Sequence, residues 1–183
     1  MINKNFIYRK ACIDDLEAVA DLVANLLGTC NIWKDKNMKD EYEIINANKK
    51  EIEKDITKYY VCEIENKIIG ACWISDIKNE NNYSLDLWKY REILYLVVDN
   101  NYQKMGIWTK LLKKCIENIN EKIIYEARWD KDEVNSKALL EKLDFKLLKD
   151  LGDTYYKDHN YCVYCVNRDK NCNSCKAELW IKE

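Results

Sequence analysis

The sequence lacks several features that would mark particular classes of protein. It has no proline, four glycines and a single histidine among 183 residues, while Asn, Lys and Ile are abundant. We interpret the missing proline as compositional bias with no bearing on function. The lone histidine, His159, lies in a polar stretch, which favours a surface position over a catalytic or metal-binding one.

Membrane and nucleic-acid partners are also disfavoured by what is missing. No apolar run is long enough to cross a bilayer, and the opening residues contain no signal-peptide core. The net charge of -2 argues against strong non-specific binding to nucleic acid. We therefore expect a cytoplasmic protein with no membrane contact. Residues 1–183 are enough for one domain with its own core, and the oligomeric state stays open, a homodimer included.

One stretch combines the patterns of a strand, a loop and a helix. Residues 92–98 form an apolar run rich in β-branched side chains, which is typical of a buried strand. Residues 99–104 are polar and turn-like. A helix is predicted from Gly106 onward because apolar residues then recur at helical spacing, at Ile107, Leu111, Leu112, Cys115, Ile116 and Ile119.

The start of this predicted helix has the properties of an anion-binding site. The first amides of a helix have no intrahelical partner, and the helix dipole makes that end partly positive. Gly106 lets the backbone approach a ligand, and Lys104 adds a positive charge. An ordinary connection between a strand and a helix explains the same pattern, so the pattern alone leaves both interpretations open.

Gln103 and Gly106 have the spacing of a known family motif, in which Gln or Arg, two residues, Gly, one residue, then Gly or Ala follow a strand directly. The stretch resembles the core motif of the GNAT superfamily of acyl-CoA-dependent N-acyltransferases. The resemblance implies that acetyl-CoA is the cosubstrate, that the loop amides hold its pyrophosphate and that the preceding strand binds its pantetheine arm. Trp108 stands where the family usually has a small residue, so its indole is expected to point away from the pyrophosphate. The residues implied in cofactor binding are Val97, Val98, Gln103, Lys104, Met105, Gly106, Ile107, Trp108 and Thr109.

The remaining elements predict a mixed α/β domain. Strands are expected at residues 6–9, 59–63, 67–74, 92–98, 123–129, 145–148 and 177–182. Helices are expected after Asp14 and Asp15, which can cap the first, within residues 29–58, from Gly106 and at residues 133–143. This order, the opening residues 8–23 and residues 136–145 all resemble the GNAT fold, which implies a single domain of α/β (α+β) class, with a central mixed twisted sheet flanked by helices.

Glu92 is predicted to be the catalytic base. Acyl transfer needs an unprotonated amine, because an ammonium ion has no lone pair. Glu92 lies eleven positions before Gln103, where several members of the resembled family carry a catalytic glutamate. A carboxylate beside apolar residues has its pKa raised by desolvation, which suits a base. The alternative is a strand-end glutamate that faces solvent or pairs with Arg91 or a lysine.

The same resemblance identifies the groups that handle the thioester. The N–H group of Val98 is expected to donate to its carbonyl. The tyrosine that usually protonates the departing thiolate falls on Leu140, so the thiolate leaves unassisted, another tyrosine serves, or catalysis is altered or lost. Two functions follow. One is an N-acetyltransferase acting on a small-molecule or protein amine; the other is a weakly active or inactive CoA-binding module that senses zinc or redox state.

Four cysteines, Cys162, Cys165, Cys172 and Cys175, form two Cys-x-x-Cys pairs. They lie in a predicted insertion at about residues 152–176, between the last two strands. Two such pairs can complete a tetrahedral site, so a structural zinc is predicted; four thiolates would leave no position for a catalytic water. Free thiols on a hairpin and a redox-active disulfide pair are the alternatives.

Overall fold

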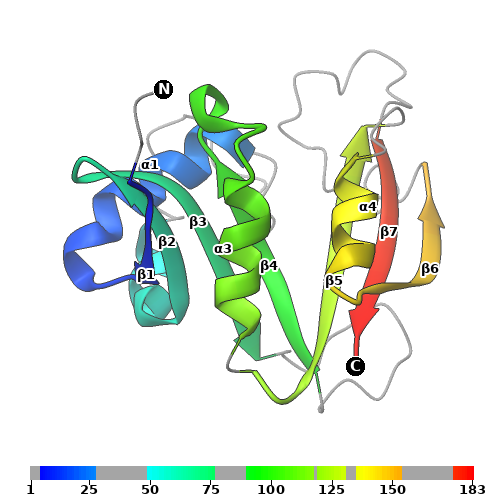
Figure 1. Ribbon diagram of the computed structural model, residues 1–183. Helices are drawn as coiled ribbons and strands as arrows, with labels where there is room; N and C mark the ends of the chain where they lie inside the picture. Colours follow the sequence, from blue (N-terminus) through cyan, green and yellow to red (C-terminus); the bar gives the residue numbers. More distant parts are fainter. Residues whose placement is uncertain (1–4, 28–48, 77–89, 118, 131–134, 154–174) are drawn as a thin grey trace, which may run out of the picture.

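The described residues form one seven-stranded sheet with helices on both faces (Figure 1). The computed structural model describes residues 5–27, 49–76, 90–117, 119–130, 135–153 and 175–183. The strands are β1 (Ile7–Lys10), β2 (Tyr59–Ile64), β3 (Lys67–Asp76), β4 (Tyr90–Val98), β5 (Lys122–Asp130), β6 (Lys146–Gly152) and β7 (Cys175–Lys182). The helices are α1 (Leu16–Leu27), α3 (Ile107–Ile116) and α4 (Asn135–Lys142), and residues 49–55 are also helical.

The sheet is mixed, with the strand order β1-β2-β3-β4-β5-β7-β6. Every neighbouring pair is antiparallel except β4 and β5, which run parallel. β7 comes last in the sequence and lies between β5 and β6. The predicted class, element order and mixed sheet are confirmed.

Two apolar layers hold the helices against the sheet. On one face, α1 and the helical residues 49–55 pack on β2, β3 and β4. On the other face, α3 and α4 pack over the middle of the sheet, with Leu111, Leu112 and Leu140 completely buried. The apolar stripe predicted for the third helix is therefore its packing face. Among the described helices, none has the length and apolar character needed to span a bilayer.

Several element boundaries differ from those predicted, for local reasons. β4 begins at Tyr90 because Tyr90 and Arg91 pair with the first residues of β5. β6 extends to Gly152, although residues 146–150 are exposed, because an edge strand needs only backbone bonds to β7. A tight hairpin joins β2 to β3; Glu65 and Asn66 have φ values of 49° and 62°, as a type I′ turn requires.

The start of α1 combines a capping bond to Asp15 with an ion-pair network. A short 3-10 turn, Ile13–Asp15, precedes the helix, and the N–H group of Cys12 donates to the Asp15 carboxylate at 2.8 Å. The Arg9 guanidinium makes two bonds to Asp15, of 2.7 and 2.8 Å, and its Nη2 and Nε donate to Glu63 at 2.7 and 2.9 Å. Arg9 thereby ties β1 to β2 and to the turn before α1.

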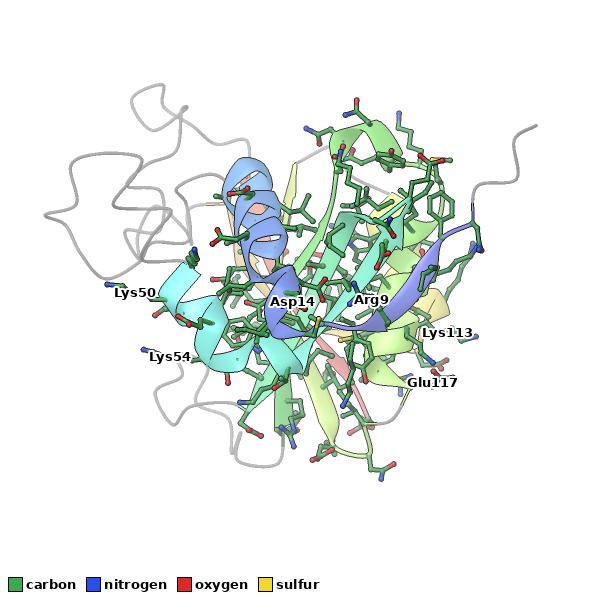
Figure 2. The ribbon with its side chains drawn as sticks, turned by 90° about the vertical axis from the view of Figure 1, so that its left-hand side faces the viewer. Arg9, Asp14, Lys50, Lys54, Lys113 and Glu117 are labelled. Carbon is green, nitrogen blue, oxygen red and sulfur yellow. The ribbon has the colours of Figure 1, made fainter. Side chains whose placement is uncertain are left out.

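This network predicts an acid-sensitive contribution to stability. Hydrogen bonding to Arg9 lowers the Asp15 pKa from 3.8 to about 2, so the contribution is complete above pH 3.8 and is lost as the pH falls toward 2. Asp15→Asn should lower the free energy of unfolding at neutral pH by about 1–2 kcal/mol, allowing for the exposure of Arg9. Asp14→Asn is the control, because Asp14 lies at the same turn and is exposed (Figure 2). Urea unfolding at neutral pH should separate the two variants; equal losses would contradict the assignment.

Candidate active site

A β-bulge in β4 shapes the candidate site. Tyr95 pairs with Trp73 and Ile93 pairs with Ile74, so Leu94 is an extra residue with no partner on β3. A bulge bends the strand and resets which residues face each side of the sheet. Residues on either side of Leu94 therefore do not follow simple alternation.

The bulge brings Glu92 and Tyr95 to the same face of the sheet. Glu92 pairs with Ser75 and Tyr95 pairs with Trp73, while Ser75 and Trp73 are two residues apart on β3. Paired residues share a face, and so do residues two apart in a strand. Trp73 and Tyr95 pack in the core layer beneath α1, so Glu92 also lies on that face.

Glu92 is mostly buried and has a perturbed acidity. Loss of hydration raises its pKa from 4.5 to about 7. Within the described part of the chain, no hydrogen bond or ion pair offsets that loss. Arg91, the neighbour considered as an alternative partner, instead pairs with Asp76 and with Glu121, the latter at 2.9 Å. The carboxylate is therefore buried without a compensating charge.

β4 and β5 separate just beyond Glu92. Their parallel pairing covers only four residue pairs, from Tyr90 with Lys122 to Ile93 with Tyr125. β5 then continues along β7 as far as Asp130, and the two strands diverge toward the end of the sheet where α3 begins (Figure 1). Residues 94–98 of β4 consequently have no strand partner on the β5 side among the described strands. Backbone groups of Val97 and Val98 are thus placed to bond a ligand at this edge.

The loop after β4 is braced by its own side chains. Asp99 accepts from the N–H group of Asn101 at 2.9 Å and from Lys67 at 3.1 Å. The amide of Gln103 donates to the side chain of Asn100 at 2.8 Å and lies 3.5 Å from the carbonyl of Val98. Gln103 therefore supports the loop with its side chain, a role that the motif alone did not predict.

The beginning of α3 presents unpaired amides. Gly106 is the N-cap, with φ of 73°, and no side chain caps the helix. The first helical bond is from Lys110 to the Gly106 carbonyl at 3.2 Å, so the N–H groups of Ile107, Trp108 and Thr109 have no acceptor within the helix. Lys104 also has positive φ, 60°, which curls the loop over the helix end.

Space lies in front of the loop. A Cβ at Gly106 would meet no atom within 4 Å, so glycine is needed there for its φ and not for packing. Met105 and Lys104 are exposed, and the partly buried indole of Trp108 packs on the core layer beneath α3. The unpaired amides, the dipole of α3 and Lys104 make this corner suited to a phosphate.

Leu140 supplies no proton donor. Its side chain is completely buried, and its carbonyl accepts from the N–H group of Phe145 at 3.0 Å.

Sequence reasoning did not identify Tyr95 as a site residue. Simple strand alternation puts residues 92 and 95 on opposite faces, and only the bulge at Leu94 reverses this.

The predicted zinc site cannot be assessed from the described residues. Cys162, Cys165 and Cys172 lie outside them, and Cys175 contributes only the backbone at the start of β7. Within the described ranges, no group of three or more His, Cys, Asp or Glu side chains could hold a metal ion.

Comparison with solved structures supports the fold. The chain superposes on the proposed acetyltransferase yncA from Salmonella typhimurium, solved with its cofactor acetyl-CoA, with a TM-score of 0.65 and 16% identity, covering 98% of this chain and 94% of the other. An N-acetyltransferase from Staphylococcus aureus Mu50 has a TM-score of 0.65 and 18% identity, covering 96% of this chain and 100% of the other. A ribosomal-protein-alanine N-acetyltransferase from Brucella melitensis has a TM-score of 0.63 and 17% identity, covering 96% of this chain and 98% of the other. The chain spans 46% of the length of another structural relative, a proposed acetyltransferase from Pyrococcus horikoshii.

Comparison of the sequence itself identifies the family. No curated protein matches the chain. The sequence profile of the acetyltransferase (GNAT) family matches residues 20–145, which extend from α1 to the end of α4 and include β4, the loop and α3. The profile covers more than half of the chain, and the solved relatives share its fold. The chain therefore belongs to the acetyltransferase (GNAT) family.

Proposed function

We propose that the protein transfers an acetyl group from acetyl-CoA to a primary amine. The observation that carries the proposal is the uncapped start of α3, which stands beside the edge of β4 that has separated from β5. The uncapped start of α3 suits a phosphate, and the free edge of β4 suits an extended arm that contains amides. The Salmonella relative was solved with acetyl-CoA, which contains phosphates and such an arm.

The cofactor-binding roles divide between the loop and the strand. The pyrophosphate would accept bonds from the amides at Ile107, Trp108 and Thr109, with Lys104 adding charge. The pantetheine arm would lie along β4 at Val97 and Val98, and the N–H group of Val98 would polarise the thioester carbonyl. Gln103, Met105 and Gly106 would set the shape of the loop.

Glu92 would accept the proton that the amine must lose. The amine nitrogen forms a bond to the carbonyl carbon, the carbon–sulfur bond breaks, and the sulfur leaves with its electron pair as a thiolate. A carboxylate with a pKa of about 7 is a stronger base than an ordinary glutamate and is still largely ionised at physiological pH. A water molecule between Glu92 and the amine would serve equally well.

The thiolate would leave without a proton donor at Leu140. A thiol with a pKa of about 8.5 is acidic enough to depart as its anion. Its release should therefore show no dependence on an acid with a pKa above neutrality. The position of Leu140 in the core is compatible with this route.

The direct test combines binding with turnover. Titration calorimetry with acetyl-CoA measures cofactor binding, and a colorimetric thiol assay measures transfer to a panel of amines that includes diamines, amino acids and peptides. Binding followed by amine-dependent thiol release supports the proposal. Binding without thiol release for any amine favours the alternative, a CoA-binding module without transferase activity. The Brucella relative is named for a protein acceptor, so peptides with a free N-terminus belong in the panel.

The cysteine cluster gives a separate prediction. We expect protein purified without chelator to carry about one zinc per chain, held by Cys162, Cys165, Cys172 and Cys175. Replacing Cys162 and Cys175 with serine should remove the metal, as measured by elemental analysis. Metal-free protein with four titratable thiols in this segment, and a melting temperature unaffected by zinc, would contradict it.

A further inference from the structure

Three aromatic rings form a continuous row across the sheet on the face that carries Glu92. Tyr59 of β2 pairs with Trp73 of β3, which pairs with Tyr95 of β4. The first two rings are 5.1 Å apart with 15° between their planes, and the second and third are 5.4 Å apart with 24° between them. Each ring thus stacks on the next at the separation typical of favourable aromatic pairs.

The row stops where the sheet opens. β5 is the next strand, but it has separated from β4 before the level of Tyr95. In the described part of the chain, Trp73 is the only ring in contact with Tyr95. Tyr95 also remains partly exposed, whereas Tyr59 is 0% exposed and Trp73 is 8% exposed. Tyr95 is therefore the last ring of the row, stacked on Trp73 and carried by the strand that borders the gap in the sheet.

The predicted base lies beside this outer ring. Glu92 and Tyr95 share a face because of the bulge at Leu94. An amine near Glu92 would therefore have the rest of its molecule next to the Tyr95 ring. The edge of β4 beyond the bulge, which carries Tyr95, is also the edge along which the proposed pantetheine arm would lie.

The row contains polar groups that destabilise the fold. The Tyr59 hydroxyl and the Trp73 indole N–H are buried and have no hydrogen-bond partner among the residues that the structure describes. A buried polar group that lacks a hydrogen-bond partner lowers the stability of the folded protein. Phenylalanine at Tyr59 would avoid this cost, so stability alone does not account for the residues present.

Carboxylates of the helical residues 49–55 lie near the row. Burial raises the pKa of both Tyr59 and Tyr95, the latter to about 12, and the nearby Glu51 carboxylate, from the helical residues 49–55, raises both further. Asp55 adds to the effect at Tyr59. A cationic molecule is favoured at such a surface over a neutral or anionic one.

We propose that the acceptor is a primary amine joined by a short chain to a planar aromatic group, whose ring stacks on the outer side of Tyr95 while its nitrogen lies at Glu92. The inference rests on the proposed function and specifies its acceptor class. Tyr95 is a specificity-determining residue in this arrangement.

The test compares amines of matched length that differ in ring type. 2-Phenylethylamine and 2-cyclohexylethylamine have similar size, but only the first is planar and aromatic; propylamine has no ring. With acetyl-CoA, 2-phenylethylamine should have a kcat/KM about twofold to tenfold above that of the cyclohexyl compound, the range expected of one stacked pair. The difference should lie in KM, because stacking binds substrate and transition state equally.

Single substitutions test which side chain causes the preference for an aromatic amine. Tyr95→Leu should remove the preference for the aromatic ring, so that kcat/KM for 2-phenylethylamine falls to about that for 2-cyclohexylethylamine. Tyr95→Phe keeps the ring and should keep the preference. Tyr60→Leu is the control, because Tyr60 pairs with Cys72 on the opposite face of the sheet from Tyr59 and packs against the other core layer.

The outcomes separate this inference from the proposed function. Equal kcat/KM for all three amines, or a preference unaffected by Tyr95→Leu, overturns the aromatic acceptor while leaving acetyl transfer intact. Failure of every amine tested, despite acetyl-CoA binding, overturns the proposed function itself. The comparison of amines needs only the unaltered protein, so a poorly folded variant does not remove the test.

Discussion

Glu92→Gln is expected to lower turnover by roughly 100-fold while leaving acetyl-CoA affinity nearly unchanged. Glutamine keeps the shape of the side chain but cannot accept the proton of the amine. In the unaltered protein, kcat/KM should rise with pH through about 7, as the carboxylate ionises. The variant should lack that rise, and its deficit should shrink at high pH, where the amine deprotonates itself. A pH–rate profile unaffected by the substitution would count against the role of Glu92.

The same substitution should make the protein more stable. The folded-state pKa of Glu92 is raised above its ordinary value, so folding favours the protonated form, and stability is lost as the pH rises from 4.5 to about 7. Above that range the charged carboxylate remains buried at a cost of at most about 3 kcal/mol, which Glu92→Gln would remove. Urea unfolding should show a gain for the variant near pH 8 and little difference near pH 4.

An exposed glutamate supplies the control. Glu121 bonds Arg91 and has a lowered pKa, chiefly through that bond, so Glu121→Gln should bring no gain in stability at alkaline pH. If both variants behave alike, the burial of Glu92 is not the cause of the effect. A residue that lowers stability and raises activity is expected at a catalytic position.

The second large effect is expected at Gly106. Substitution by valine or asparagine should weaken acetyl-CoA binding at least about tenfold, because a side chain would enter the open space in front of the loop amides. Valine would also strain the backbone, since φ there is 73°. Asparagine tolerates this backbone conformation, so a loss of acetyl-CoA affinity in that variant would come from obstruction of the loop amides and not from backbone strain. Calorimetry would measure the affinity, and thermal unfolding would confirm that the asparagine variant is folded.

Gly152 provides a matched control for Gly106. It also has positive φ, 88°, and a Cβ there would likewise meet no atom within 4 Å. It lies at the end of β6, on the edge strand, far along the sheet from β4. Gly152→Asn should leave acetyl-CoA affinity unchanged. An equal loss in both variants, or no loss at Gly106, would place the phosphate site elsewhere.

The sequence predicted β4, the following loop and α3 because each of them is defined by residues that are close together in the sequence. A β-branched run, a polar loop and apolar residues at helical spacing define β4, the loop and α3 without reference to the rest of the chain. Burial of Glu92 was predictable for the same reason, since apolar residues flank it in the strand.

Features that depend on distant partners were not predictable. The bulge at Leu94 arises from how β4 pairs with β3, a strand that begins more than twenty residues earlier, and the position of Tyr95 depends on it. The Asp15 carboxylate was predicted to cap a helix, yet its main partner is Arg9, whose orientation is fixed by Glu63 on β2. The end of β6 was missed because backbone pairing with β7, and not an apolar pattern, sustains it.

The place of β7 in the sheet has a consequence for how the molecule assembles. β2, β3 and β4 can each pair with an antiparallel neighbour as soon as they have been synthesised, and β1 can pair once β2 has been synthesised. β6 pairs only with β7 among the described strands, and β7 also pairs along nearly the whole of β5. During translation, β5, α4 and β6 must therefore remain without their central strand until residues 175–182 emerge. Folding of the half that carries β1 to β4 can precede that moment, whereas the other half closes in a single late step.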